Sequence, residues 1–193
     1  APGGHSWLHF GRPSAIHGIV QLGARITAIK LNGNPRTTYN IGIIEGGQSI
    51  NSIAASAGIW LDMRSERRSG VEALEREVRT HIDALTGENL SFTVEVVGDR
   101  PAGQVAPGHP LIVAAQAALR QVGTRPSLET GSTDGNIPLA HGCPTVTIGI
   151  TRGGNAHRLD EYIETEPVAA GMQQLILLTL AVESSIDLMN EGK

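Results

Sequence analysis

The sequence predicts an α/β protein built in two parts. Residues 14–97 alternate helical and strand-like patterns in the order of a split βαβ unit. A Pro- and Gly-rich stretch over 99–109 is typical of a linker, and after it apolar helices flank a strand that is apolar on both faces. We therefore expect one domain over 1–100 and a second over 101–193.

Two helices are predicted in the first part. Pro13 and Ser14 open a helical stripe of apolar residues, which comprises Ile16, Ile19, Val20, Ile26 and Ile29. Ser69 and Glu72 have the spacing of a capping box at the start of the second helix, and Gly87 is expected to end that helix.

Three strands complete this part. Residues 37–44, 54–64 and 90–97 each alternate apolar and polar positions, as half-buried strands do. In the first of them, Ile41 and Ile43 are expected on the same side. The order helix, strand, strand, helix, strand is a split βαβ unit that lacks its first strand, so we expect an incomplete domain.

The second part is predicted to contain two long helices and one strand. The helices cover 109–122 and 166–189, the latter with Thr165 as its N-cap and Pro167 in its first turn. The strand over 144–150 has no polar alternation, as in a buried α/β sheet. So few strands do not make a stable sheet, so we expect this part to be incomplete as well.

The composition excludes several classes of protein. The 193 residues have a formal net charge of −4, and no basic cluster exceeds the pair Arg67–Arg68, which argues against nucleic-acid binding. The longest apolar run, over 175–182, is too short to cross a membrane. Cys143 is the only cysteine, which favours a reducing compartment, and we expect a cytoplasmic protein.

His157 is the first candidate for chemistry. It follows the apolar strand and two glycines, which places it at the carboxyl end of a sheet, where α/β proteins keep their sites. A zinc site needs three or four ligands. Asp160 and Glu161 are near, but they are equally explained as carboxylates that favour the start of the next helix. An ordinary loop histidine stays an open alternative.

Three other stretches have two readings each. The run GSTDGN at 131–136 suits either an anionic group or a simple N-cap. Arg64 either pairs with Asp62 or presents its guanidinium to a substrate carboxylate. His5 follows two glycines that allow close approach to a ligand, and alone it indicates little.

In order and spacing, four stretches of the chain resemble one family of hydrolases. They are GGHSWLHFGRPSAIHGI, TTYNIGIIEGGQSINSIAASAGIWLDMRS, ETGSTDGNIPLAHGCPTVTIGI and GGNAHRLDEYIETEPVAAGMQQLILLTL. The family is that of the di-zinc aminoacylase, carboxypeptidase G and tripeptide aminopeptidase (peptidase T-like) enzymes. The resemblance implies that residues 1–100 form a ferredoxin-like dimerisation or lid domain, in which the first strand is incomplete. The C-terminal part of a zinc-exopeptidase α/β catalytic domain would follow over 101–193.

The resemblance also implies roles for single residues. His157 would ligate one of two zinc ions per subunit, and His5 would reach the neighbouring subunit's active site of a homodimer to stabilise the oxyanion. The remaining residues would contact the substrate, Asn51 within the same composite site as His5 and the others at the substrate's carboxylate. They are Asn51, Arg64, Gly131, Ser132 and Thr133.

The chain departs from the family in its metal ligands. In the family, the H-x-D motif, a bridging aspartate, a Glu-Glu pair and a further ligand precede the lid domain, and that part is absent here. We expect a fragment of a zinc-dependent exopeptidase or amidohydrolase that cleaves a peptide or N-acyl amide bond next to a free carboxylate. The chain by itself is expected to be inactive, with zinc absent or incomplete. The alternative is a non-catalytic dimerisation or binding module.

Overall fold

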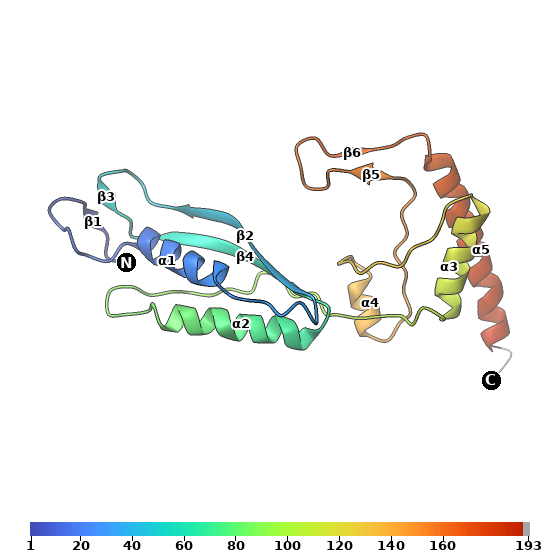
Figure 1. The fold of residues 1–193 in the computed structure, drawn as a ribbon, viewed down its shortest axis with the longest axis horizontal. Coiled ribbons are helices and arrows are strands. Elements are labelled where there is room, and N and C mark those ends of the chain that lie inside the picture. Colours follow the sequence, from blue (N-terminus) through green and yellow to red (C-terminus); the bar gives the residue numbers. More distant parts are fainter. Residues whose placement is uncertain (191–193) are drawn as a thin grey trace. The chain divides into compact units, whose positions relative to one another are not determined.

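Two long antiparallel strands form the floor of the first half of the chain. They are β2 (Thr37–Gly46) and β4 (Ala57–Ser65), and helices α1 (Ala15–Thr27) and α2 (Arg68–Asp83) pack against them (Figure 1). The structure is a computed structural model that describes residues 1–190, and side chains up to residue 184. The chain folds into two units, Ala1–Asp99 and Arg100–Lys193.

The core of the first unit lies between its helices and one face of the strands. Apolar residues of α1 and α2 meet the inward side chains of β2 and β4, and Ile26 is fully buried at the centre. The predicted start of the first helix is confirmed, because Ser14 is the N-cap of α1. The Tyr39 hydroxyl donates to the carbonyl of Thr27 at 3.1 Å and so joins β2 to the end of α1.

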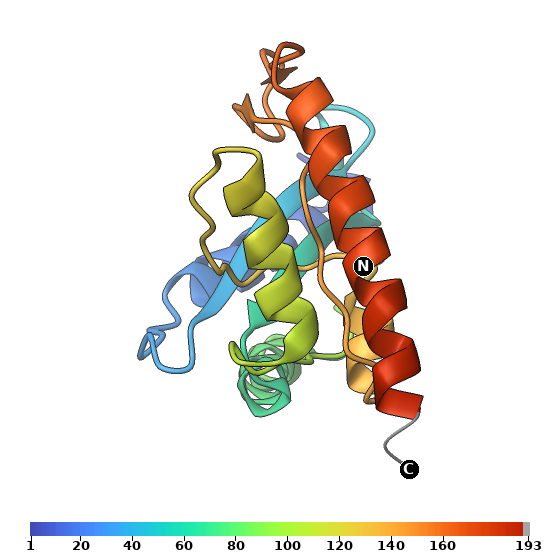
Figure 2. The same ribbon diagram turned by 90° about the vertical axis from the view of Figure 1, so that its right-hand side faces the viewer.

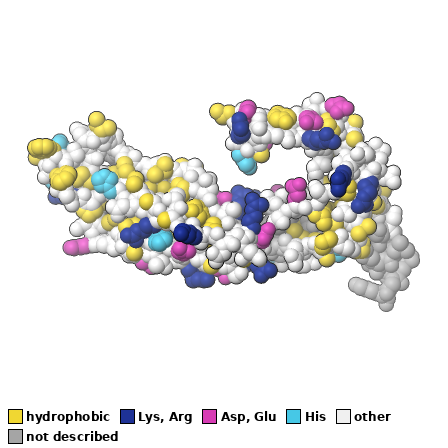
Figure 3. All heavy atoms as spheres, in the orientation of Figure 1, with side chains coloured by type: hydrophobic (Ala, Val, Ile, Leu, Met, Phe, Trp, Pro, Cys, Tyr) yellow, Lys and Arg dark blue, Asp and Glu magenta, His cyan; other side chains and the backbone are white. Residues whose placement is uncertain are grey.

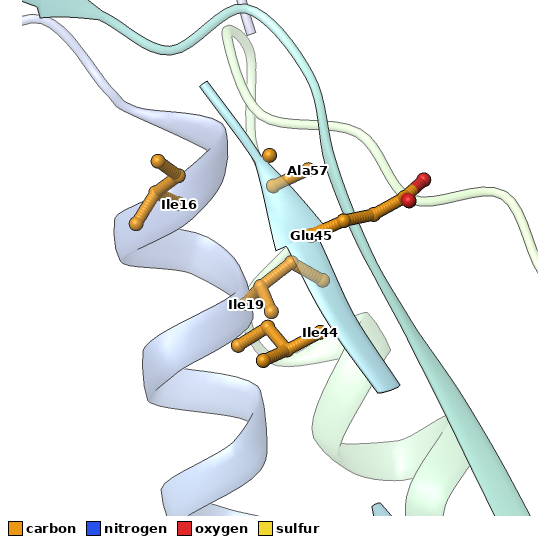
Figure 4. A pocket seen from close by; sticks show the side chains of 6 residues that line it. Ile16, Ile19, Ile44, Glu45 and Ala57 are labelled. Atoms are coloured by element: carbon orange, nitrogen blue, oxygen red, sulfur yellow. The ribbon is translucent and has the colours of Figure 1, made fainter. Parts of the chain in front are cut away.

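A bulge changes which isoleucine faces the helices. The pairing shifts between Ile41, which opposes Leu61, and Ile43, which opposes Trp60. A bulge inserts one extra residue into a strand, so every later side chain changes face. The expectation that Ile43 shares the side of Ile41 is therefore wrong. Ile44 takes the inner face instead, where it lines a shallow apolar groove beside α1 (Figure 4).

The expected strand over 90–97 does not form. Leu90 makes only an isolated bridge with Gly87, while Phe92 packs against the core and Val96 is exposed. Alternation reports which side chains can be buried, but a strand also needs a neighbouring backbone. The segment is held at its end instead, where Arg68 donates to the Asp99 carboxylate at 2.6 Å, which raises the pKa of Arg68.

The capping box expected from Ser69 and Glu72 does not form. Helix α2 begins at Arg68 with Arg67 as its N-cap, so Ser69 lies inside the first turn. The Glu72 carboxylate accepts from the Arg68 side chain at 3.2 Å rather than from the backbone. The helix ends at Asp83, and Gly87 lies beyond it.

The second unit is dominated by two helices that run side by side (Figures 1 and 2). These are α3 (Pro110–Gln121) and α5 (Val168–Asn190), which pack through Ala115, Ala118 and Leu178. The unit also contains the short helix α4 (Asn136–Ala140) and the two-residue strands β5 (Gly153–Gly154) and β6 (Tyr162–Ile163).

Helix α3 is predicted well, and α5 begins slightly later than expected. His109 caps α3, because its Nδ1 accepts from the amide of Leu111 at 3.2 Å. Thr165 and Pro167 form a turn before α5, in which the Thr165 carbonyl accepts from Val168 at 3.3 Å.

The expected strand over 144–150 does not form either. No strand lies beside it within residues 1–190, although Val146 and Ile148 pack against α3 and α5. Its end approaches α5 so closely that a Cβ at Gly171 would collide with the carbonyl of Ile150. In the described part of the chain, no helix is both long and apolar enough to cross a membrane.

The substitution Ile26→Ala is expected to lower the free energy of unfolding of the first unit by roughly 2–5 kcal/mol, because it leaves a cavity in the core. Val20→Ala removes an exposed side chain of the same helix and should change this free energy by less than about 0.5 kcal/mol. Urea unfolding followed by circular dichroism measures both. Equal losses would contradict this position of the core.

Candidate functional site

A short ladder brings His5 and Asn51 together. Strand β1 (Gly4–His5) pairs antiparallel with β3 (Ser52–Ile53), so His5 lies opposite Ser52. The amide of Ser6 then donates to the carbonyl of Asn51 at 2.9 Å. Two residues that are far apart in sequence therefore meet at one end of the first unit.

The backbone fixes the imidazole of His5. Its Nδ1 accepts from the amide of Trp7 at 3.2 Å, with the amide of Leu8 behind it at 3.5 Å. A nitrogen that accepts a hydrogen bond carries no proton, so the neutral ring has its proton on Nε2. This Nε2–H is the kind of donor that stabilises a developing oxyanion.

Asn51 offers side-chain donors at the same end of the first unit. Its Oδ1 accepts from the Ser49 hydroxyl at 2.8 Å. Among the described residues, no acceptor lies within hydrogen-bond distance of its amide nitrogen. The amide is therefore available to an acceptor from outside the unit.

Large apolar side chains surround His5 and are exposed. The exposed fractions are 84% for Trp7, 74% for Leu8 and 92% for Phe10, and Ile50 of the neighbouring loop is fully exposed. Figure 3 shows hydrophobic side chains gathered with a histidine over this end of the first unit. Side chains of this size on a surface mark a contact with a partner or a ligand.

Arg64 does not join His5 and Asn51 within the unit. It lies at the far end of β4, seven residues from Ala57, which amounts to roughly 23 Å of extended strand. Its Nε donates to the Asp62 carboxylate at 2.7 Å, so the surface pair forms. The role in binding a substrate carboxylate stays a prediction.

The stretch Gly131–Thr133 precedes α4, as the turn-to-helix pattern predicted. The amide of Thr133 donates to Asn136 Oδ1 at 2.8 Å, and its hydroxyl lies 3.0 Å from that of Thr147. Asn136 also donates to the carbonyl of Pro101 at 3.0 Å. The loop is thus held by the side chains of Asn136 and Thr147, and Asn136 is itself tied to the backbone carbonyl of Pro101.

His157 lies in the loop between β5 and β6. Its φ is 65°, and its amide donates to the Glu161 carboxylate at 3.2 Å. Within the described part of the chain its imidazole makes no hydrogen bond. Asp160 is bound by Arg158 at 2.8 Å. The reading of Asp160 and Glu161 as helix-start carboxylates is therefore wrong, because α5 begins only at Val168.

The described residues do not assemble a metal site. They contain no group of three or more His, Cys, Asp or Glu side chains that could hold a metal ion. His157 supplies one exposed imidazole, and the Glu161 carboxylate accepts from the backbone amide of His157 rather than from its ring.

His9 is a further residue of this site, which no motif in the sequence indicates. Its Nδ1 accepts from the amide of His5 at 2.9 Å, and its own amide donates to the carbonyl of His5. The signal in the sequence was a second histidine four residues after the first, following two glycines. Only the geometry of the turn makes this spacing meaningful.

The chain is similar to several known proteins. Residues 4–89 match the family model of the peptidase dimerisation domain, M20_dimer. The chain is 30% identical over 148 residues to acetylornithine deacetylase of Edwardsiella ictaluri, which covers 74% of this chain and 37% of that protein. It is 25% identical over 172 residues to succinyl-diaminopimelate desuccinylase of Methylorubrum populi, which covers 83% and 43%. The chain thus spans less than half the length of these relatives.

Two solved structures share the fold. Aminopeptidase PepT from Bacillus cereus superposes with a TM-score of 0.68 at 25% identity, over 94% of this chain and 49% of that one. A tripeptidase from Staphylococcus aureus gives a TM-score of 0.68 at 22% identity, over 91% and 47%. Residues 4–89 therefore form a dimerisation domain of the M20 peptidase family, which confirms the resemblance found in the sequence.

Proposed function

We propose that this chain belongs to a zinc-dependent exopeptidase or N-acyl-amino-acid hydrolase, as its dimerisation domain and the C-terminal part of its catalytic domain. The enzyme would cleave a peptide or N-acyl amide bond next to a free carboxylate. The observation that most supports this is the ring of His5, whose Nδ1 accepts from the amide of Trp7, in a strand pairing on a dimerisation domain that also brings in the backbone of Asn51. The names of the relatives, a deacetylase, a desuccinylase and an aminopeptidase, agree with this reaction class.

His5 and Asn51 would act in the active site of the other subunit of a homodimer. Both lie at an exposed end of the first unit, and in the described part of the chain no metal-binding cluster exists beside them. The exposed side chains of Trp7, Leu8 and Phe10 support a partner subunit as the surface that covers this end. In the second subunit, the His5 donor would meet the negative charge that develops on the scissile carbonyl.

His157 would contribute one ligand to a zinc site. Its imidazole is exposed and free of hydrogen bonds to described residues, which suits a metal ligand. When bound, zinc polarises the carbonyl and activates water. The other ligands would come from sequence outside this chain, since the curated relatives are more than twice as long as the part matched.

Arg64 and the loop at 131–133 would recognise the substrate carboxylate. Asp62 occupies only the Nε of Arg64, so its two terminal nitrogens remain for a bidentate contact. Thr133 is fixed by Asn136 and Thr147, which would preorganise the loop.

The chain by itself would be inactive, because it lacks a complete ligand set among its described residues. A cytoplasmic location is part of the proposal and rests on the single cysteine. The second candidate function, a non-catalytic dimerisation module, is favoured by the same absence of a metal cluster in residues 1–184.

Subunit complementation tests the composite site. In the full-length protein, His5→Ala and His157→Ala are each expected to lower kcat/KM by about a hundredfold or more, because one removes the oxyanion donor and the other a metal ligand. In a random mixed dimer of the two variants, one active site has both histidines. An equimolar mixture should therefore recover roughly a quarter of the wild-type activity.

His17→Ala provides the matched control, because His17 is an exposed histidine of α1 outside the proposed site. It should retain wild-type activity. No recovery in mixtures that demonstrably contain mixed dimers would mean that both histidines act within one subunit. Wild-type protein that hydrolyses neither peptides nor N-acyl amino acids, with zinc supplied, would favour the non-catalytic module.

The zinc content is expected to differ between this chain and the full-length protein. Elemental analysis of the chain, after dialysis against zinc, is expected to give much less than one ion per chain. His157→Ala should change its zinc affinity by less than about twofold, since one ligand forms no stable site. In the full-length protein the same substitution should remove bound zinc. Stoichiometric zinc in the chain that is lost with His157 would contradict the proposed need for outside ligands.

A further inference from the structure

The turn that contains His5 is closed by a reciprocal pair of histidines. The amide of His5 donates to His9 Nδ1 at 2.9 Å, and the amide of His9 donates to the carbonyl of His5 at 2.9 Å. A third bond, from the amide of Trp7 to His5 Nδ1, lies inside this ring. Main chain and side chain of His5 are thus fixed within one turn.

The His9 ring holds the backbone of His5, while the Trp7 amide holds its side chain. His9 is half-buried and His5 is exposed. Because His9 Nδ1 accepts a hydrogen bond, its neutral ring also has its proton on Nε2. The two rings therefore differ in role: the His9 ring packs into the turn, whereas the His5 ring is exposed.

Gly4 makes room for the His9 ring. A Cβ at this position would lie 2.7 Å from His9 Nδ1 and 3.1 Å from its Cγ. The φ of Gly4 is 149°, a conformation that residues with a side chain rarely adopt. A glycine is therefore needed before His5, because the His9 ring packs against this position.

We propose that His9 is a positioning residue for His5, which it holds so that the Nε2–H of His5 points to a ligand. The catalytic meaning of this role rests on the proposed function above, whereas the positioning itself does not. A donor directed at developing charge must be held to within about half an ångström of its productive place. Loss of the His9 acceptor would leave the His5 amide unpaired and loosen the turn.

The positioning is tested on the chain itself by long-range ¹H–¹⁵N NMR of the histidine rings. In the wild type, His5 at neutral-ring pH should appear as the single tautomer protonated at Nε2. His9→Ala should convert this into a mixture of the two tautomers. His9→Asn should restore the single tautomer, because its Oδ1 can accept the same bond. His17→Ala is the control and should leave the His5 signals unchanged.

Kinetics of the full-length protein provide the second readout. His9→Ala should lower kcat by roughly tenfold and change KM by less than about twofold, because a misplaced donor affects mainly the transition state. His9→Asn should return kcat to within about threefold of the wild type. In a His5→Ala background, His9→Ala should have no further effect, since its action passes through His5.

The outcomes separate the two proposals. A single His5 tautomer that survives His9→Ala, or a kcat loss that His9→Asn does not rescue, would overturn the positioning role. Correct tautomer shifts in a full-length protein without hydrolytic activity would leave the positioning intact and overturn the proposed function instead.

Discussion

The first unit depends on the antiparallel pairing of β2 with β4. This ladder provides the only extended surface in the unit, among the described residues, on which α1 and α2 bury their apolar stripes. The bulge after Ile41 then turns the remainder of β2, so that Ile44 lines the groove next to α1. Beyond the ladder, the strand Ser52–Ile53 branches off to meet His5. The position of the histidine therefore follows from where the sheet ends.

The sequence predicts the helices better than the strands, and the reason is physical. Buried residues recur at helical spacing in α1 and α3, although Ile16 and Val20 of the predicted α1 stripe are exposed, and a helix satisfies its own backbone. The apolar positions in 90–97 and 144–150 report burial equally well, and Phe92 and Val146 are indeed packed inward. Whether such a segment pairs depends on a neighbouring strand, which no local pattern encodes.

The candidate site shows a similar division. His5, Asn51 and His157 are candidates from motifs alone, and only the ladder between β1 and β3 explains why the first two lie at one end of the unit. Arg64 lies at the end of β4 that is far from His5. The alternation of side chains along a strand shows which face a residue takes, but not which end of the strand lies near another residue. His9 escaped notice because a spacing of four residues has structural meaning only when the turn between them is known.

The turn that follows His5 contains both the exposed apolar side chains and the amides that orient the His5 ring. Covering Trp7, Leu8 and Phe10 would stabilise an assembly by roughly 1.5–3 kcal/mol for each fully buried side chain. The amides of Trp7 and Leu8 are the groups that face His5 Nδ1. A subunit that packs on the side chains of Trp7 and Leu8 would therefore also fix the backbone amides that orient the His5 imidazole. In the proposed dimer, the contact that stabilises association is the contact that aims the donor, so a loosened interface would lower catalysis before the subunits separate.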